Sequence, residues 1–363
     1  MTTVEEKAKI ETSTNQLMEF LEEVSGLSAA QKKRVYKTLV DFGITHPLAF
    51  KNRTVKELTR IDGISENVAE KIVEHANPSK KGELLFKSLA EVKKEEDSTI
   101  MISTGSKRLD ELLGGGISLG TLVEFYGSPQ SGKTQLCYTI AANTLLEIGG
   151  VLWLDTEGSF RPSRLEQILF YLEEKKKEKI DEKQKEKINS QFNVATVRTL
   201  AQLELALQQV EKVITAYDVK LLVVDSLMDI FRAEYGGLGE LAERQKHLNV
   251  VVHKMMKLAD AYNIAVVYTN QVMANPDPFA TALDKVQPVG GFVLGHASDI
   301  RIWLRRATSA TKKKYDAPNA RRAMITDCGW LPMEETIFSI GAFGICDVEE
   351  ESEMKEEANI EEK

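Results

Sequence analysis

The chain has 363 residues, of which 42% are hydrophobic and 28% charged, a composition typical of a globular protein with room for a main domain and a smaller one. No apolar run reaches the ~20 residues that cross a bilayer, and the polar N-terminus lacks the apolar segment of a signal peptide. Three widely separated cysteines argue against disulfides and a zinc site. We therefore expect a cytoplasmic protein without a membrane partner.

The net charge of -8 is unevenly distributed along the chain. Residues 348–363 hold eight Glu and two Lys, so this tail carries -6 of the total. Residues 301–322 hold eight Lys or Arg and one Asp, a local charge of +7. A basic patch that binds nucleic acid is therefore compatible with an acidic chain.

The first 78 residues predict a disordered start over residues 1–16 and a small all-α domain over residues 17–78. Thr54 and Glu57 form a capping-box pattern that opens a helix, and Gly63 lies in a short turn before a second helical run. The segment resembles a helix-hairpin-helix module, in which hairpin amides around Gly63 grip a DNA backbone. A helical hairpin whose glycine merely permits a tight turn explains the pattern equally well.

Residues 79–98 are rich in Lys and Glu and predict a linker. This linker carries apolar residues that an exposed segment would not retain without a docking partner, among them Phe86 and Leu89. Residues 173–187 are almost all charged and predict a solvent-exposed helical segment that projects from the core. Residues 348–363 predict a disordered acidic tail.

From residue 99 to residue 347 the chain alternates apolar strands with helical stretches. The expected strands are residues 121–126, 151–155, 192–197, 221–225 and 265–268. Near-continuous apolar strands separated by helices predict an α/β domain with a mainly parallel sheet covered on both faces. Ligands of such a sheet bind at the carboxyl ends of its strands.

A phosphate-binding loop follows the first of these strands and precedes a helix. Its eight residues are Gly127, Ser128, Pro129, Gln130, Ser131, Gly132, Lys133 and Thr134, and the predicted nucleotide site continues to Gln135. The glycines let backbone amides and a helix N-terminus point at phosphates. Lys133 supplies positive charge for the phosphates and Thr134 a hydroxyl for Mg²⁺. The predicted ligands are ATP and Mg²⁺, and the predicted core is a P-loop ATPase.

Two carboxylates follow other strands at the same edge. Asp225 ends the strand at residues 221–225 and fits the second motif of such enzymes, in which a carboxylate supports the metal. Glu157 lies just after the strand at residues 151–155 and is the natural candidate to orient or deprotonate the attacking water.

Three longer runs give the chain a family resemblance. Residues 154–162 (LDTEGSFRP), 231–235 (FRAEY) and 269–274 (TNQVMA) are similar to the archaeal RadA recombinases and their eukaryotic counterparts in the RecA superfamily. The resemblance spans residues 17–347, including the small N-terminal domain. It implies a RecA-like ATPase core that forms filaments on single-stranded DNA, exchanges it with homologous double-stranded DNA and serves recombination and repair. In an archaeal cell it would also imply association with the nucleoid.

The resemblance assigns roles residue by residue. Lys133, Glu157 and Gln271 form the catalytic set, with Gln271 sensing the γ-phosphate and coupling it to the loop that follows. Arg164 stacks on adenine. His296 reaches the nucleotide of a neighbouring protomer, although a lone histidine is more often structural.

The same resemblance implies DNA contacts and self-assembly. A first DNA loop includes Arg232, Tyr235 and Arg244, and a second spans about residues 273–290 with Phe279. Arginines neutralise phosphates in such loops, and an aromatic ring stacks on or wedges between bases. Phe86 and Leu89 match a polymerisation motif that plugs into the next protomer.

Several positions depart from the family pattern, namely Leu89, Pro129, Leu238 and residues 327–329 (DCG). They keep a second hypothesis open, in which the chain is a recombinase paralogue that binds ATP and regulates or loads a partner recombinase without exchanging strands. Mediator proteins are expected partners in either case. A hexameric helicase with the same core is a third hypothesis, but nothing in the chain resembles a helicase loading domain.

Overall fold

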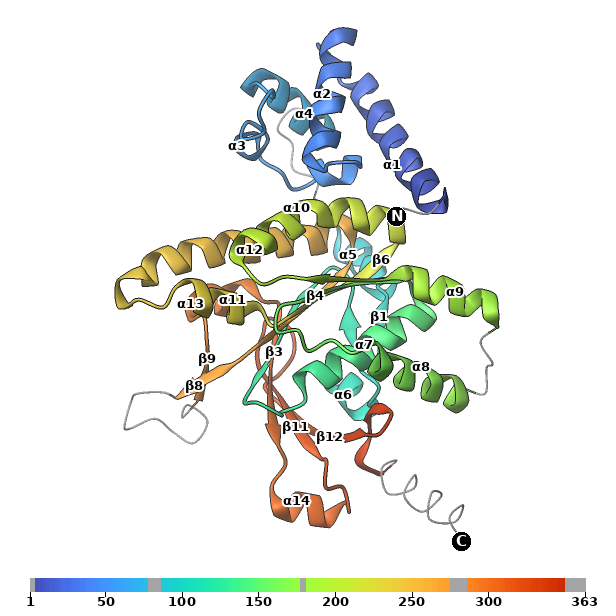
Figure 1. The fold of residues 1–363 in the computed structure, drawn as a ribbon, viewed down its shortest axis with the longest axis vertical. Helices are drawn as coiled ribbons and strands as arrows, with labels where there is room; N and C mark the ends of the chain where they lie inside the picture. Colours follow the sequence, from blue (N-terminus) through green and yellow to red (C-terminus); the bar gives the residue numbers. More distant parts are fainter. Residues whose placement is uncertain (1–3, 78–85, 177–180, 275–285, 350–363) are drawn as a thin grey trace.

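The structure is a computed structural model that describes residues 4–77, 86–176, 181–274 and 286–349 (Figure 1). A group of helices at the N-terminal end lies on one side of a larger α/β core. Among the helices of these ranges, none is long and apolar enough to cross a bilayer.

The N-terminal group consists of α1 (Val4–Glu23), α2 (Ala29–Phe42), η1 (Pro47–Phe50), α3 (Val55–Leu58) and α4 (Glu66–Ala76). Leucine and phenylalanine side chains from several of these elements are fully buried between them, including Leu17, Leu39 and Phe50. The predicted capping box forms at Thr54 and Glu57, although the helix that it opens is a single turn. Gly63 joins α3 to α4 with a φ of 95°, the left-handed conformation that favours glycine.

The structure corrects the expected disorder over residues 1–16, because α1 begins at Val4. Its C-terminal half is anchored by tertiary contacts. Leu17 and Leu21 are fully buried, and the Ser13 hydroxyl donates a 3.0 Å hydrogen bond to the carbonyl of Thr45. A polar sequence can remain helical when one end is held in this way.

The predicted linker contains a helix, α5 (Leu89–Asp97), capped by Ser88 and Glu91. All of its side chains are at least partly exposed. Residues 78–85, which include the apolar Leu84 and Leu85, lie outside the described ranges.

The core is built on a nine-stranded sheet with the order β13-β12-β11-β10-β3-β7-β6-β4-β5. Six neighbouring strands are parallel: β10 (Ile300–Arg306), β3 (Leu122–Gly127), β7 (Ala265–Asn270), β6 (Val219–Asp225), β4 (Gly150–Asp155) and β5 (Phe192–Thr196). The other three, β11 (Arg321–Cys328), β12 (Glu335–Gly341) and β13 (Gly344–Cys346), continue the sheet as antiparallel strands. The α/β expectation is therefore confirmed, while the antiparallel edge was not predicted.

Helices cover both faces of this sheet. On one face α7 (Lys133–Glu147), α8 (Pro162–Lys176) and α9 (Glu182–Gln191) pack over a core that includes Trp153 and Phe125. On the other face α10 (Leu200–Tyr217), α11 (Leu227–Glu234) and α12 (Leu241–Tyr262) share a second core with the N-terminal helices. The predicted charged segment over residues 173–187 corresponds to the end of α8 and the start of α9, with residues 177–180 outside the described ranges.

Shorter elements complete the core. They are β1 (Met101–Ile102), α6 (Lys107–Leu112), β2 (Ile117–Ser118), η3 (Leu238–Glu240), β8 (Val272–Ala274), β9 (Val286–Pro288), α13 (Phe292–Ala297) and α14 (Ser309–Lys314). The ordered core extends slightly beyond its expected end at residue 347, because Val348 is fully buried beside Ala317 and Ala320. The acidic residues from 350 onward lie outside the described ranges.

Candidate nucleotide and DNA site

The phosphate loop joins β3 to α7, as its sequence predicts. β3 ends at Gly127 and α7 begins at Lys133, directly after Gly132. Gly132 has a φ of 106°, and a Cβ at this position would lie 2.7 Å from Ile340 Cδ1. A side chain here would have to displace the end of Ile340 and would strain the backbone, so the loop favours glycine.

The interior of this loop is polar. Lys133 Nζ folds back over the loop and donates to the carbonyls of Gly127 (2.9 Å) and Ser128 (3.2 Å). Burial lowers the pKa of the Lys133 ammonium. Negative charge placed beside this ammonium would stabilise its protonated form. Ser131 Oγ is buried without a hydrogen bond in the part of the chain that is described. An anion carrying several acceptor oxygens fits these groups.

Thr134 and Asp225 form the predicted metal-binding pair. Thr134 Oγ1 donates a 2.9 Å hydrogen bond to Asp225 Oδ2, and Thr269 Oγ1 donates one of 2.5 Å to Asp225 Oδ1. Burial raises the pKa of the Asp225 carboxyl, while the two hydroxyls favour its ionised form. A hydroxyl and a carboxylate are oxygen ligands of the type that Mg²⁺ prefers, so these residues fit the ion.

Glu157 is held at the carboxyl end of β4 by a tightly bonded loop. Ser226 Oγ donates a 2.7 Å hydrogen bond to Glu157 Oε1. The preceding Asp155 accepts hydrogen bonds from the backbone amides of Gly158, Ser159 and Phe160, at 2.8, 3.1 and 3.3 Å. The side chain of Glu157 is exposed, whereas that of Asp155 is buried. Glu157 is therefore free to meet a water molecule and Asp155 orders the loop.

Gln271 links Glu157 to Arg232 of the candidate first DNA loop. Its Nε2 lies 3.5 Å from Glu157 Oε1, and its Oε1 accepts a 2.5 Å hydrogen bond from Arg232 Nη1. Gln271 follows β7 and lies 114 residues from Glu157 and 39 from Arg232 in sequence, so the sheet edge brings distant groups together. A continuous polar connection therefore runs from the candidate water-activating carboxylate to a candidate DNA-binding arginine.

Arg164 and Gln135 meet on the other side of the phosphate loop. Arg164 Nε donates a 2.8 Å hydrogen bond to Gln135 Oε1, and the guanidinium also bonds the carbonyls of Gly341 and Ala342 in the β12–β13 turn. This position beside α7 is compatible with the predicted adenine contact. His296 is not part of this cluster. It lies exposed on α13, stacked 6.0 Å from the ring of Phe292.

The described residues of the two candidate DNA loops meet at Gln245, whose Nε2 donates a 3.2 Å hydrogen bond to the carbonyl of Gly290. Tyr235 OH and His247 Nδ1 are 2.6 Å apart, which fixes the start of α12 against the end of α11. Arg244, one turn into α12, has a buried Nε without a hydrogen bond in the described ranges. β8 and β9 pair as the stem of the second loop (Figure 1). Phe279 lies outside the described residues.

The basic stretch over residues 301–322 is less available to DNA than its charge implies. Arg301 Nε donates a 2.5 Å ion-pair hydrogen bond to the fully buried Glu124. Arg305 and Arg322 both pair with Glu335. Three of the eight cations are therefore engaged by two carboxylates of the same chain. The three lysines of α14 lie at the far end of the molecule from the N-terminal helices (Figure 1).

Comparison with known proteins identifies the family. A family model described as Rad51 matches residues 95–348. The chain belongs to the Rad51 family. It is 38% identical over 331 residues to the "DNA repair and recombination protein RadA" of Aeropyrum pernix, an alignment that covers 89% of this chain and 95% of the relative. A protein of the same name from Ignicoccus hospitalis is 39% identical over 324 residues, covering 86% and 92%. Another from Metallosphaera sedula is 34% identical over 358 residues, covering 96% and 99%.

Several supporting residues of this Rad51-family chain were not predicted from its sequence. Ser226 donates a hydrogen bond to Glu157, and Thr269 donates one to Asp225. Both lie at the carboxyl ends of buried strands, and this position in the sequence could have indicated that they belong to the site. Arg306 donates a hydrogen bond from the end of β10 to Gln130 of the phosphate loop, a contact between distant segments that no local pattern indicates.

Proposed function

We propose that this chain is an ATP-dependent DNA strand-exchange recombinase, acting in homologous recombination and repair through filaments on single-stranded DNA. Support comes from membership in the Rad51 family and from relatives named for DNA repair and recombination. The observation that carries the proposal is the hydrogen-bonded series Glu157–Gln271–Arg232. It gives the nucleotide and DNA sites a physical means to influence each other.

In this proposal each residue of the phosphate site has one task. Lys133 and the amides of the phosphate loop hold the β- and γ-phosphates. Thr134 and Asp225 supply oxygen ligands for Mg²⁺, which when bound neutralises charge on the phosphates. Glu157 accepts a proton from, or orients, the attacking water, and Ser226 fixes the carboxylate for that role.

Gln271 has two partners, one at each end of its side-chain amide. Its amide nitrogen faces Glu157 and its amide oxygen faces Arg232. When Arg232 turns to a DNA phosphate, Gln271 loses that partner and is free to reorient toward the nucleotide. DNA binding would thereby change the environment of Glu157. This exchange of partners is our account of DNA-dependent ATP hydrolysis.

Self-assembly follows from two exposed groups. Phe86 is 89% exposed just before α5, and Phe292 is 84% exposed beside His296. We propose that Phe86 and Leu89 insert into the core of one neighbour and that His296 approaches the nucleotide site of another. Each ATP would then be bound between two protomers, in a head-to-tail arrangement that generates a filament.

The direct test is strand exchange between single-stranded DNA and a homologous duplex, with electron microscopy of the protein on single-stranded DNA and a non-hydrolysable ATP analogue. The proposal predicts filaments, exchange and an ATPase rate raised by single-stranded DNA. Gln271→Ala should lower the ratio of rates with and without DNA by about tenfold. Gln209→Ala, at an exposed position of α10, should keep that ratio. ATP binding without filaments or exchange would instead support the paralogue hypothesis.

A further inference from the structure

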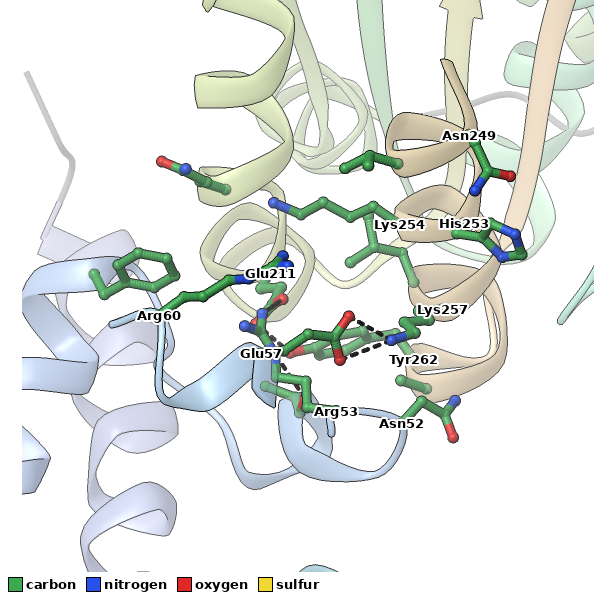
Figure 2. A pocket seen from close by; sticks show the side chains of 16 residues that line it. Asn52, Arg53, Glu57, Arg60, Glu211, Asn249, His253, Lys254, Lys257 and Tyr262 are labelled. Atoms are coloured by element: carbon green, nitrogen blue, oxygen red, sulfur yellow. Dashed lines mark hydrogen bonds and ion pairs between the residues drawn. The ribbon is translucent and has the colours of Figure 1, made fainter. Parts of the chain in front are cut away.

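A cavity of about 600 Å³ that is lined by several charged side chains lies between the N-terminal helices and the core (Figure 2). The N-terminal side contributes Arg53, Glu57 and Arg60, and helices α10 and α12 of the core contribute Glu211 and Lys254, among others. α10 and α12 cover the face of the sheet opposite α7, the helix that begins at the phosphate loop. The cavity is therefore separate from the nucleotide site.

The charges that line this cavity do not balance. Four cations, Arg53, Arg60, Lys254 and Lys257, face two carboxylates, which leaves a net charge of +2 with His253 neutral. Both carboxylates are already engaged. Glu57 accepts hydrogen bonds of 2.6 and 2.8 Å from Lys257, and Glu211 pairs with Arg53.

Lys254 and Arg60 are the two cations left over. Neither makes an ion pair within the part of the chain that the structure describes. In Figure 2 the Lys254 side chain extends from α12 across the cavity, and Arg60 enters from the N-terminal side. Two unpaired cations from opposite walls face a common space, which an anion between them would fill.

The environment of Lys254 supports this interpretation. Burial, together with the charge of Arg53, lowers the pKa of its ammonium to about 8. The nearby carboxylates of Glu211, Glu204 and Glu57 act in the opposite direction and raise it. A partly buried cation without a counter-ion is costly, and an anion placed beside it removes part of that cost. Amide groups of Asn249 and Gln208 also line the cavity and supply neutral donors.

We propose that this cavity binds a phosphate-bearing ligand, held between Lys254 of the core and Arg60 of the N-terminal domain. The +2 charge matches a phosphate dianion or two successive phosphodiesters better than a single carboxylate. A guanidinium is suited to paired phosphate oxygens and an ammonium to a point charge. The volume has room for more than one phosphoryl group. Because the two cations belong to different domains, the ligand also fastens the N-terminal domain to the core.

The test uses full-length protein carrying Lys133→Ala, so that the phosphate loop contributes little, and titrates it with inorganic pyrophosphate by calorimetry. Adding Lys254→Met or Arg60→Met should weaken binding by about tenfold or more. Lys254→Arg should retain it. Lys212→Met is the matched control, an exposed lysine on α10 outside the cavity, and should bind like the parent.

A second arm separates free phosphates from a DNA backbone. If the natural source is DNA, Lys254→Met in otherwise unaltered protein should reduce the salt dependence of DNA binding by about one unit of slope, and Lys212→Met should not. If only pyrophosphate binding weakens, the source is a free phosphate compound. If neither measurement changes in Lys254→Met and Arg60→Met, the site does not exist.

Two further readouts exclude a merely structural role. Without ligand, the melting temperature of Lys254→Met should be no lower than that of the parent, because the substitution removes a desolvated charge. If Lys254→Met does not fold, Arg60→Met decides the outcome, because Arg60 is exposed and its replacement should not affect folding. Pyrophosphate affinity should fall as the pH rises through about 8 in the parent, because Lys254 loses its proton there. That fall should be smaller in Lys254→Arg. The other charged or titratable groups facing Lys254 are Glu211, Glu204, Glu57, Arg53, Lys257 and His253, and both proteins share them.

Discussion

The carboxyl edge of the parallel strands has its polar side chains paired within the chain, whereas the outer surfaces at α5 and at α13 expose large apolar side chains. At the strand edge Lys133, Thr134, Glu157 and Asp225 each have a hydrogen-bond partner within the chain. On the outer surface Phe86 and Leu89 are 89% and 85% exposed, and Phe292 is 84% exposed. The chemistry is pre-organised in one chain, whereas the surfaces that would join chains are left uncovered.

This contrast indicates which properties belong to the single chain. Nucleotide binding rests on groups that the fold holds in place, so it should survive when assembly is abolished. Efficient hydrolysis and DNA response should require neighbours, because His296 of the same chain lies outside the phosphate cluster. Variants at the strand edge and at the outer surface should therefore have different defects.

The largest effect should come from Lys133→Ala, which removes the cation at the centre of the phosphate loop. With no comparable charge beside the phosphates, turnover should fall by about 10³-fold and nucleotide binding should weaken strongly. Steady-state ATPase and binding of a fluorescent nucleotide measure both. Wild-type turnover in this variant would remove the phosphate-loop assignment.

Glu157→Gln should lower hydrolysis by about 10²-fold. The amide keeps the shape of the side chain and accepts the Ser226 hydrogen bond but cannot take a proton, so ATP should still bind. Single-turnover hydrolysis gives the rate and equilibrium binding gives the affinity. Ser226→Ala, which leaves the carboxylate but removes its partner, should have a smaller effect. Unchanged hydrolysis in Glu157→Gln would mean that another residue activates the attacking water.

Phe86→Glu should break assembly without unfolding the core, because nothing described in the core covers this ring. Burying such a side chain at an interface contributes on the order of 2 to 4 kcal/mol. Particle size on DNA should fall and DNA-stimulated ATPase should fall with it. Phe170→Glu, at an exposed phenylalanine of α8, is the matched control. Intact filaments in Phe86→Glu would exclude self-assembly through this segment.

Replacing Lys312, Lys313 and Lys314 with Ala should have the smallest effect. If α14 faces DNA, binding should weaken for all sequences, and the salt dependence should decrease by about one unit of slope for each phosphate that the lysines no longer neutralise. An unchanged slope would mean that α14 is a solvated basic helix. Arg301→Ala should not mimic this result, since Arg301 is bound to buried Glu124.

Much of the core and its strand-edge residues could be predicted, because short sequence patterns indicate them. Buried strands that end in Asp or precede a glycine loop specify both an element and its edge, as at Asp225 and Gly127. Other features depended on distant contacts. The ordered start of α1 rests on Ser13 and Leu17 packing against later segments, and the antiparallel edge from β11 to β13 lacks the pattern of buried parallel strands.

Charge was the least reliable signal when taken alone. Arg301 contributes to a strongly basic stretch of sequence, yet it lies in an ion pair with a glutamate 177 residues away. Phe86, by contrast, is uncovered in the single chain, as its place in a charged linker indicates. An isolated aromatic residue among charges indicates an unfilled contact, whereas a run of arginines does not say whether its partners lie inside the protein or outside it.

The central claim is that each nucleotide site is shared between neighbouring protomers, and mixing two defective variants tests it most directly. Lys133→Ala protein keeps His296, and His296→Ala protein keeps the phosphate loop. In a random equal mixture about one quarter of head-to-tail interfaces should pair the two intact halves. The account predicts that DNA-dependent ATPase of the mixture rises well above the average of the separate variants. A mixture no more active than that average would contradict a shared site.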